Sequence, residues 1–186
     1  MLDASILPLE NTRARLRPLH PDDAMAFAQG TDDPAVRQFG HLPQPEYTPA
    51  SVRAMIEQDA SPGLERGDLA VLAMARARTD MFAGSLVIFG VSAESAEVGF
   101  WLHPAHRGSG ITSAALDLAA ELSRRSGLRE LTARTLPENV ASQRVLDEAG
   151  FTLQGRDTGT APSGHRAELL HYAHLLRDGP RENGSA

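Results

Sequence analysis

Apolar residues recur with the period of an α-helix in two long segments of the chain, residues 111–126 and 139–149. The first segment has its apolar residues three and four positions apart, which places them on one face. They are Ile111, Ala114, Ala115, Leu118, Ala119 and Leu122. Gly127 and Gly150 follow the two segments and are typical helix-ending residues. Both segments are therefore predicted to be amphipathic helices.

The remaining elements are predicted from shorter patterns. Strand-like segments span 13–19, 68–77, 84–91, 96–103, 130–136, 151–154 and 167–176. Short helices are predicted at Pro21, at Asp33-Pro34 and after a cap at Thr48 or Ser51. Three consecutive strands indicate antiparallel pairing, and the strand–helix–strand unit after them indicates one parallel crossover. This order predicts an α+β fold, a mixed α/β sandwich whose mostly antiparallel sheet has six to seven strands and about four or five flanking helices.

Length and composition narrow the function classes. The chain has 186 residues, and we expect a single domain over 1–176 with a flexible C-terminal tail at 177–186. The formal net charge of −6 argues against a nucleic-acid partner, and the lack of a long apolar run argues against a membrane partner. The chain contains no cysteine, which excludes a disulfide, a thiolate nucleophile and a cysteine-ligated metal. With no signal-peptide pattern, the expected location is cytoplasmic.

A glycine-rich turn separates a strand from a helix in residues 97–115, which read EVGFWLHPAHRGSGITSAA. Glycine lets backbone N–H groups approach an anion, and a helix N-terminus adds unpaired N–H groups and a partial positive charge. Arg107 adds a charge-assisted contact. The turn is therefore predicted to bind a phosphate-bearing cofactor.

Three phosphate-binding patterns compete for this turn, beside an ordinary loop that leads into a helix. A P-loop requires a lysine that is absent here. A dinucleotide fingerprint requires a third glycine where Ser113 stands, and the preceding strands form a meander rather than βαβ units. The third pattern is [Q/R]-x-x-G-x-[G/A], with Arg107, Gly110 and Thr112 at its defined positions.

With this third pattern the segment resembles the GNAT family of acyl-CoA-dependent N-acyltransferases, in the form found in the subfamily that acetylates N-terminal amines of ribosomal proteins. Two further segments resemble the family, TRARLRPLHPDDA near the start and ENVASQRVLDEAGF in the second half. The resemblance covers nearly the whole chain and implies a GNAT-like fold, with a splayed parallel strand pair. It further implies acetyl-CoA as co-substrate, no metal, and a monomer or homodimer.

The implied reaction is acetyl transfer to a primary amine, either a protein N-terminus or a small molecule. No cysteine nucleophile exists, so direct attack in a ternary complex is expected. Two alternatives stay open. The chain could be a catalytically degenerate acyl-CoA-binding module, or it could use another acyl-CoA such as succinyl-CoA.

The resemblance also implies which residues hold the cofactor. Backbone donors for the pyrophosphate are Gly108, Ser109, Gly110 and Ile111. Thr112 stands where glycine or alanine is usual and could either crowd the pyrophosphate or donate a hydrogen bond to it. The pantetheine arm is expected along the strand formed by Phe100, Trp101 and Leu102, with a main-chain N–H near Leu102 polarising the thioester carbonyl. Asn139 and Ser142 complete the cofactor site.

Two residues are expected to carry proton chemistry. Glu97 could accept the proton of the amine directly or through water, or it could be a solvated carboxylate at a strand end. Ser142 matches the serine proposed in the subfamily to hydrogen-bond the CoA thiol, or it simply occupies the first turn of a helix capped by Asn139. Leu146 occupies the position where many family members have a tyrosine. Catalysis by proximity and orientation alone is therefore a further possibility.

The acceptor side is less defined by sequence. By the resemblance, residues 39–47 and 156–165 cover it, and Phe39 and Tyr47 are candidate substrate contacts. Each aromatic could instead be a local packing anchor. The histidines do not form a metal motif, and His103 is expected to pack or donate near the cofactor.

Overall fold

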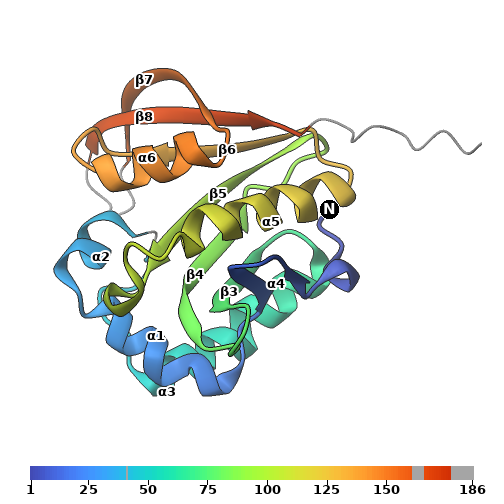
Figure 1. The fold of residues 1–186 in the computed structure, drawn as a ribbon, viewed down its shortest axis with the longest axis vertical. Coiled ribbons are helices and arrows are strands. Elements are labelled where there is room, and N and C mark those ends of the chain that lie inside the picture. Colours follow the sequence, from blue (N-terminus) through green and yellow to red (C-terminus); the bar gives the residue numbers. More distant parts are fainter. Residues whose placement is uncertain (41, 161–165, 177–186) are drawn as a thin grey trace, which may run out of the picture.

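A single mixed sheet connects the strands of the computed structural model, which describes residues 1–40, 42–160 and 166–176. Within these residues the sheet has eight strands in the order β1-β2-β3-β4-β5-β6-β8-β7 (Figure 1). The strands are β1 (Leu9–Glu10), β2 (Ala14–Pro18), β3 (Ala70–Arg76), β4 (Phe82–Phe89), β5 (Ser95–Leu102), β6 (Glu130–Thr135), β7 (Thr152–Thr160) and β8 (Arg166–Leu175). Every neighbouring pair is antiparallel except β5 and β6, which are parallel.

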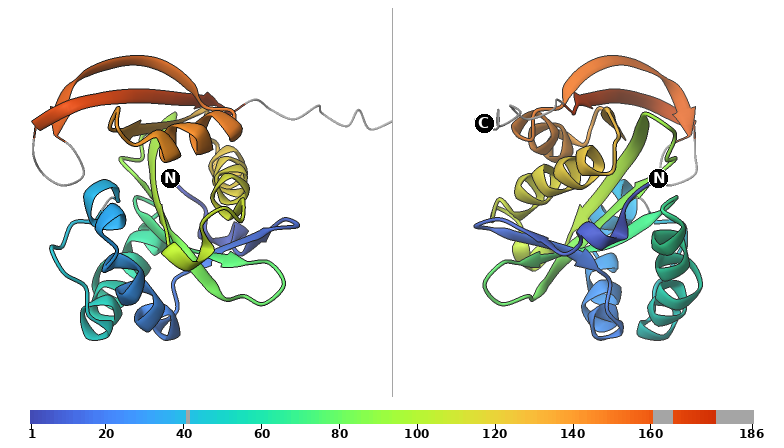
Figure 2. Two further views of the ribbon diagram at one scale, coloured as in Figure 1. Left: turned by 60° about the vertical axis from the view of Figure 1, so that its left-hand side comes forward. Right: turned by 90° about the vertical axis from the view of Figure 1, so that its right-hand side faces the viewer.

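Helices cover both faces of this sheet. They are α1 (Ala24–Thr31), α2 (Pro34–Phe39), α3 (Pro49–Met55), α4 (Ser61–Arg66), α5 (Ile111–Arg125) and α6 (Val140–Glu148). A π-helical segment, η3 (Ile56–Ala60), joins α3 to α4 without a break. Figure 2 shows α5 on one side of the sheet and α1, α3 and α4 on the other. Among the helices in the described part of the chain, none has both the length and the apolar character that crossing a bilayer requires.

The parallel strands β5 and β6 separate part-way along their length. Their ladder pairs Ser95 with Glu130, Ala96 with Leu131 and Glu97 with Thr132, and it ends there. Both strands continue beyond this point, because β5 stays paired with β4 and β6 stays paired with β8. The sheet is therefore splayed after Glu97, which confirms the expected gap between the two strands.

The two faces of β5 pack into different apolar clusters. Val98 is buried with Leu116 and Leu122 of α5 on one face. Trp101 is buried with Phe27 of α1 on the other, where the two rings meet edge to face with centroids 5.0 Å apart. Side chains therefore alternate between the two faces along β5.

The predicted elements are present, with three differences. The two-residue strand β1 was not predicted, because it is too short to show a periodic pattern. Strand β7 extends to Thr160 rather than ending at Gln154, and its residues Thr152–Thr160 are mostly exposed, so no apolar pattern marks them. The predicted third helix continues through η3 into α4. The predicted tail at 177–186 lies outside the described residues.

Candidate functional site

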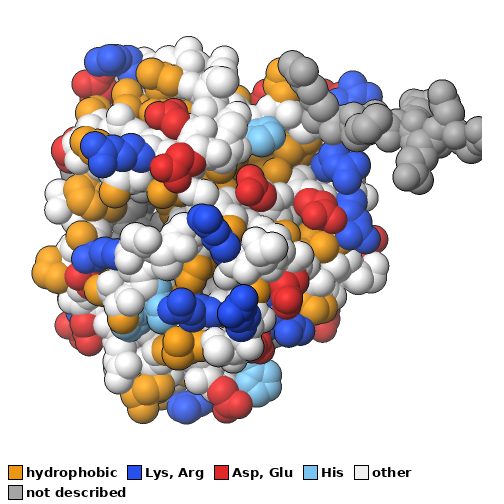
Figure 3. All heavy atoms as spheres, in the orientation of Figure 1, with side chains coloured by type: hydrophobic (Ala, Val, Ile, Leu, Met, Phe, Trp, Pro, Cys, Tyr) orange, Lys and Arg blue, Asp and Glu red, His pale blue; other side chains and the backbone are white. Residues whose placement is uncertain are grey.

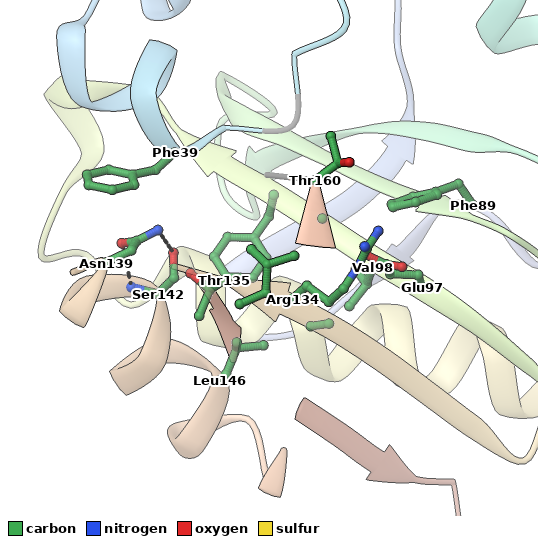
Figure 4. A pocket seen from close by; sticks show the side chains of 14 residues that line it. Phe39, Phe89, Glu97, Val98, Arg134, Thr135, Asn139, Ser142, Leu146 and Thr160 are labelled. Atoms are coloured by element: carbon green, nitrogen blue, oxygen red, sulfur yellow. Dashed lines mark hydrogen bonds and ion pairs between the residues drawn. The ribbon is translucent and has the colours of Figure 1, made fainter. Parts of the chain in front are cut away.

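Three cavities meet at Phe100 of β5, just beyond the last rung between β5 and β6. The splay cavity, about 330 Å³, lies between the separated strands and includes Glu97, Ser142 and Leu146 in its lining (Figure 4). The turn cavity, about 500 Å³, runs from Trp101 to the glycine turn and the start of α6. The α3 cavity, about 360 Å³, lies on the opposite face of the sheet from α5, and Tyr47 lines it.

The glycine turn has the backbone conformation that its sequence predicts. Gly108 and Gly110 adopt φ angles of 73° and 71°, in the left-handed region that favours glycine. Gly110 is the N-cap of α5, and no side-chain hydrogen bond caps this helix end. The Ser109 hydroxyl donates to the carbonyl oxygen of His106 at 2.5 Å and so closes the turn. The first backbone N–H groups of α5 are thereby left for an anion.

Arg107 makes a contact that the sequence did not predict. Its Nη2 lies 2.6 Å from Oδ1 of Asp33, which also caps α2 by accepting from the N–H groups of Ala35 and Val36. The hydrogen bond from Arg107 is the main cause that lowers the pKa of Asp33. Arg107 lines the turn cavity, but its guanidinium ties the glycine turn to α2.

A second arginine, Arg13, lies beside the N-terminus of α5. A β-carbon on Gly110 would lie 2.5 Å from Nη1 of Arg13, so the guanidinium rests against this glycine. Asn11 positions the turn before β2, since its Oδ1 accepts from the Arg13 N–H and its Nδ2 donates to the carbonyl of Ala114 at 2.8 Å. Among the described residues, no carboxylate pairs with Arg13.

Basic side chains gather on the face that carries the N-terminal end of α5 (Figure 3). In the sequence Arg13 belongs to an alternating arginine–apolar strand pattern, which gives no sign of contact with a turn almost a hundred residues later. The contact depends on the register of β1 against β2 and on the packing of α5 against β2.

Glu97 lies at the last rung of the parallel ladder and is paired with Arg134 of β6. The Nε of Arg134 is 2.8 Å from Oε1 of Glu97, and the Glu97 side chain is 23% exposed. Figure 4 shows the two side chains next to each other in the splay cavity. Glu97 is therefore a positioned carboxylate at the splayed gap rather than a freely solvated one. Arg134 is a site residue that the sequence analysis missed.

Asn139 and Ser142 form a two-way hydrogen-bonded pair at the start of α6. Oδ1 of Asn139 accepts from the Ser142 N–H at 3.2 Å, and Nδ2 of Asn139 donates to Ser142 Oγ at 2.8 Å. Since Oγ accepts this hydrogen bond, the hydroxyl proton is directed away from Asn139. Both residues line the splay and turn cavities, so helix capping and orientation of the hydroxyl occur together. Leu146 follows one turn later and lines the splay cavity.

The strand expected to hold the pantetheine arm and the start of α5 both line the turn cavity. Phe100, Trp101 and Leu102 all line the turn cavity, and Trp101 also lines the α3 cavity. Ile111 and Thr112 are buried at the start of α5. Only Thr112 of these two lines the turn cavity.

The two candidate substrate contacts lie in different cavities. Phe39, at the end of α2, lines the splay and turn cavities and packs beside Leu136 and Leu169. Tyr47 is buried in the α3 cavity, and its hydroxyl accepts from the Gln44 N–H at 3.3 Å. Burial raises the pKa of Tyr47. Each residue is thus both a packing contact and part of a cavity wall.

The histidines serve local structure where they are described. His103 Nδ1 accepts from the Ala105 N–H at 3.2 Å, His171 pairs with Asp157, and His174 contacts the carbonyl of Ala149. Burial, together with the neighbouring His103, lowers the pKa of His106. Within the described part of the chain, no group of three or more His, Asp or Glu side chains is placed to hold a metal ion. His165 lies outside it.

Comparison with known proteins identifies relatives of the chain. The acetyltransferase (GNAT) domain family matches residues 13–152. The probable N-acetyltransferase YjcK of Bacillus subtilis (strain 168) is 31% identical over 83 residues, which are 42% of this chain. The match spans about half of that relative, 46% of its length.

Solved structures share the fold. RimJ of Mycobacterium smegmatis, in complex with CoA-disulfide, has a TM-score of 0.76 at 22% identity, covering 87% of this chain and 81% of that one. The ribosomal-protein-S5-alanine acetyltransferase of Vibrio fischeri has a TM-score of 0.78 at 16% identity, covering 92% and 98%. A Salmonella typhimurium acetyltransferase that modifies the N-terminal serine of ribosomal protein L7/L12 has a TM-score of 0.74 at 21% identity, covering 90% and 97%.

Proposed function

Because the chain belongs to the GNAT family of acetyltransferases, we propose that it transfers the acetyl group of acetyl-CoA to a primary amine. The observation that carries the proposal is the meeting of three cavities at Phe100, where β5 has just separated from β6. A donor that enters from the glycine turn and an acceptor that enters from another side would meet at this point. That arrangement supports direct attack in a ternary complex.

The residues at the turn suit a pyrophosphate. Gly108 and Gly110 supply left-handed backbone, and α5 supplies uncapped N–H groups and the positive end of its dipole. A β-carbon at Gly110 would intrude on Arg13, so the close approach of backbone and cation depends on glycine. The pantetheine arm then extends along the turn cavity, where its amides pair with β5 as an added strand would.

The proposed chemistry uses Glu97 and Ser142. The carboxylate of Glu97 takes a proton from the acceptor ammonium, directly or through water. The amine nitrogen attacks the thioester carbonyl carbon, and a β5 N–H near Leu102 stabilises the oxygen that gains charge. After the C–N bond forms, the C–S bond breaks, and the nitrogen gives its second proton to the departing sulfur, so that a neutral amide and the CoA thiol are released. The departing thiolate receives a hydrogen bond from the Ser142 hydroxyl, whose orientation is set by Asn139.

A protein N-terminus is the first acceptor class to test, with small-molecule amines as the second. Ribosomal-protein acetyltransferases are among the structures that share this fold. A panel of N-terminal peptides and small amines, incubated with acetyl-CoA, succinyl-CoA and longer acyl-CoAs, identifies donor and acceptor together by mass spectrometry. Acetylated amine formed over many turnovers supports the proposal. Saturable CoA binding without product across the panel contradicts it and favours a degenerate acyl-CoA-binding module.

Replacing Arg13 with Gln is expected to weaken CoA binding about tenfold, because a charge-assisted contact to phosphate is lost. Isothermal titration with CoA measures the effect, and it should shrink as salt concentration rises. Arg129→Gln is the matched control, since Arg129 is an exposed arginine paired with Glu94 and follows the C-terminal end of α5, away from the glycine turn. Equal CoA affinities for the two variants would exclude a phosphate contact by Arg13.

Replacing Glu97 with Gln is expected to lower kcat/KM about tenfold, because the amide retains an acceptor for Arg134 but takes up no proton. Glu94→Gln is the control, because Glu94 is an exposed glutamate directly before β5 and lines none of the three cavities. An unchanged kcat/KM in Glu97→Gln would show that another group accepts the proton.

A further inference from the structure

Among the described residues that line the α3 cavity, one side chain is charged. The described lining of the cavity is largely apolar and aromatic, with Phe27, Met55 and Trp101 among the contributors. Gln44, Tyr47 and Ser85 add polar groups, and Asp59 adds the carboxylate. A largely apolar cavity with a few convergent polar groups is the usual form of a small-ligand site.

Asp59 belongs to the π-helical segment η3, between α3 and α4. Ile56 and Ala60 of this segment are buried, with exposed fractions of only 4% and 5%, and so hold the π-helical turn against the core. Asp59 itself is exposed and lines the cavity. Single π-helical turns inside α-helices are frequent at functional sites.

The Asp59 carboxylate is not neutralised by a neighbour. Among the described residues no hydrogen bond or ion pair engages it. Its charge acts on Tyr47, whose pKa is raised first by burial and also by Asp59. An exposed carboxylate that has no cationic partner among the described residues and lines an aromatic cavity can pair with the ammonium group of a ligand that enters this cavity.

The inner end of the α3 cavity reaches the proposed reaction centre. Gly99, Phe100 and Trp101 of β5 line it, and Gly99 and Phe100 also line the splay cavity that contains Glu97. A ligand that fills the α3 cavity thus contacts the segment of β5 where the thioester is expected. It would approach from the face opposite α5, whereas CoA would approach from the glycine turn.

We propose that the α3 cavity is the acceptor pocket and that Asp59 selects acceptors that join an ammonium group to an apolar group. This inference rests on the proposed acetyl transfer. The ammonium that Asp59 binds is either the reacting group before it loses its proton or a second cation on the acceptor. Comparing acceptors that carry one amine with acceptors that carry two distinguishes the reacting ammonium from a second cation.

Steady-state kinetics with Asp59→Asn test the selection. The probes are phenethylamine, which has one amine, and tripeptides that carry lysine or norleucine at the second position. KM for at least one cationic probe is expected to rise about tenfold, with kcat nearly unchanged. An effect on phenethylamine assigns Asp59 to the reacting ammonium, and an effect confined to the lysine peptide assigns it to a second cation. Glu57→Gln, an exposed carboxylate of the same segment outside the α3 cavity, should leave KM unchanged.

Trp101 provides a readout that does not depend on catalysis. It is the single tryptophan of the chain, and it lines the α3 cavity. Titration with the same probes should change its fluorescence, with about tenfold weaker binding in Asp59→Asn than in Glu57→Gln. Equal affinities and equal KM values in the two variants would overturn the role of Asp59 while leaving acetyl transfer intact. Selective amine binding without acetylated product would instead contradict the proposed function alone.

Discussion

Replacing Ser142 with Ala is expected to lower kcat about a hundredfold while the affinity for CoA stays within about twofold of wild type. The hydroxyl accepts from Asn139 Nδ2 at 2.8 Å and so has its own proton available for the leaving thiolate. Leu146, one turn further along α6, offers no hydroxyl that replaces it. Steady-state kinetics that follow release of free thiol measure kcat, and titration calorimetry measures CoA affinity.

Ser113→Ala is the matched control for this prediction. Ser113 lies on α5, donates to Glu148 at 2.9 Å and lines none of the three cavities. Its removal should leave kcat unchanged. If Ser142→Ala retains a rate within about threefold of wild type, then proximity and the N–H donors of β5 carry the reaction without a hydroxyl.

Replacing Gly110 with Ala is expected to weaken CoA binding about thirtyfold, the largest effect on affinity among the variants considered. The φ of 71° strains any residue with a β-carbon, and that carbon would lie 2.5 Å from Nη1 of Arg13. The Arg13 guanidinium, at the end of a flexible side chain, then shifts away from the turn, and both are proposed to contact the pyrophosphate. Titration calorimetry with CoA reports this loss.

Gly127→Ala separates this effect from general backbone strain. Gly127 follows the other end of α5 with a φ of 89°, and a β-carbon there meets no atom within 4 Å. Both variants should lower the melting temperature to a similar extent, since both place alanine in the left-handed region. Only Gly110→Ala should lose CoA affinity. Equal CoA affinities of the two variants would show that the glycine turn does not bind CoA.

The sequence predicted the elements well where periodicity is strong. Helix α5 and strands β3 to β6 lie close to their predicted limits, because a long apolar pattern determines both the type of element and the face that it buries. The splayed gap followed from the family resemblance and is present after Glu97. Strand β7 was predicted too short because Thr152–Thr160 is mostly exposed, and its extent is set by pairing with β8 rather than by burial.

The site was less predictable because its contacts join distant segments. The pairing of Arg107 with Asp33 and the contact of Arg13 with Gly110 were not predicted, and the phosphate contact of Arg107 stays a prediction. Arg134 was not predicted to pair with Glu97, since that contact depends on the register of parallel strands. Such pairings follow from tertiary packing, which no local pattern encodes.

The meeting of donor and acceptor at Phe100 is tested most directly by initial-rate kinetics with acetyl-CoA and an amine varied together. Transfer within one ternary complex predicts reciprocal plots that intersect, because both substrates must be bound before the C–N bond forms. Parallel lines would show that the acetyl group first moves to the protein, and they would contradict direct attack at the splayed strands.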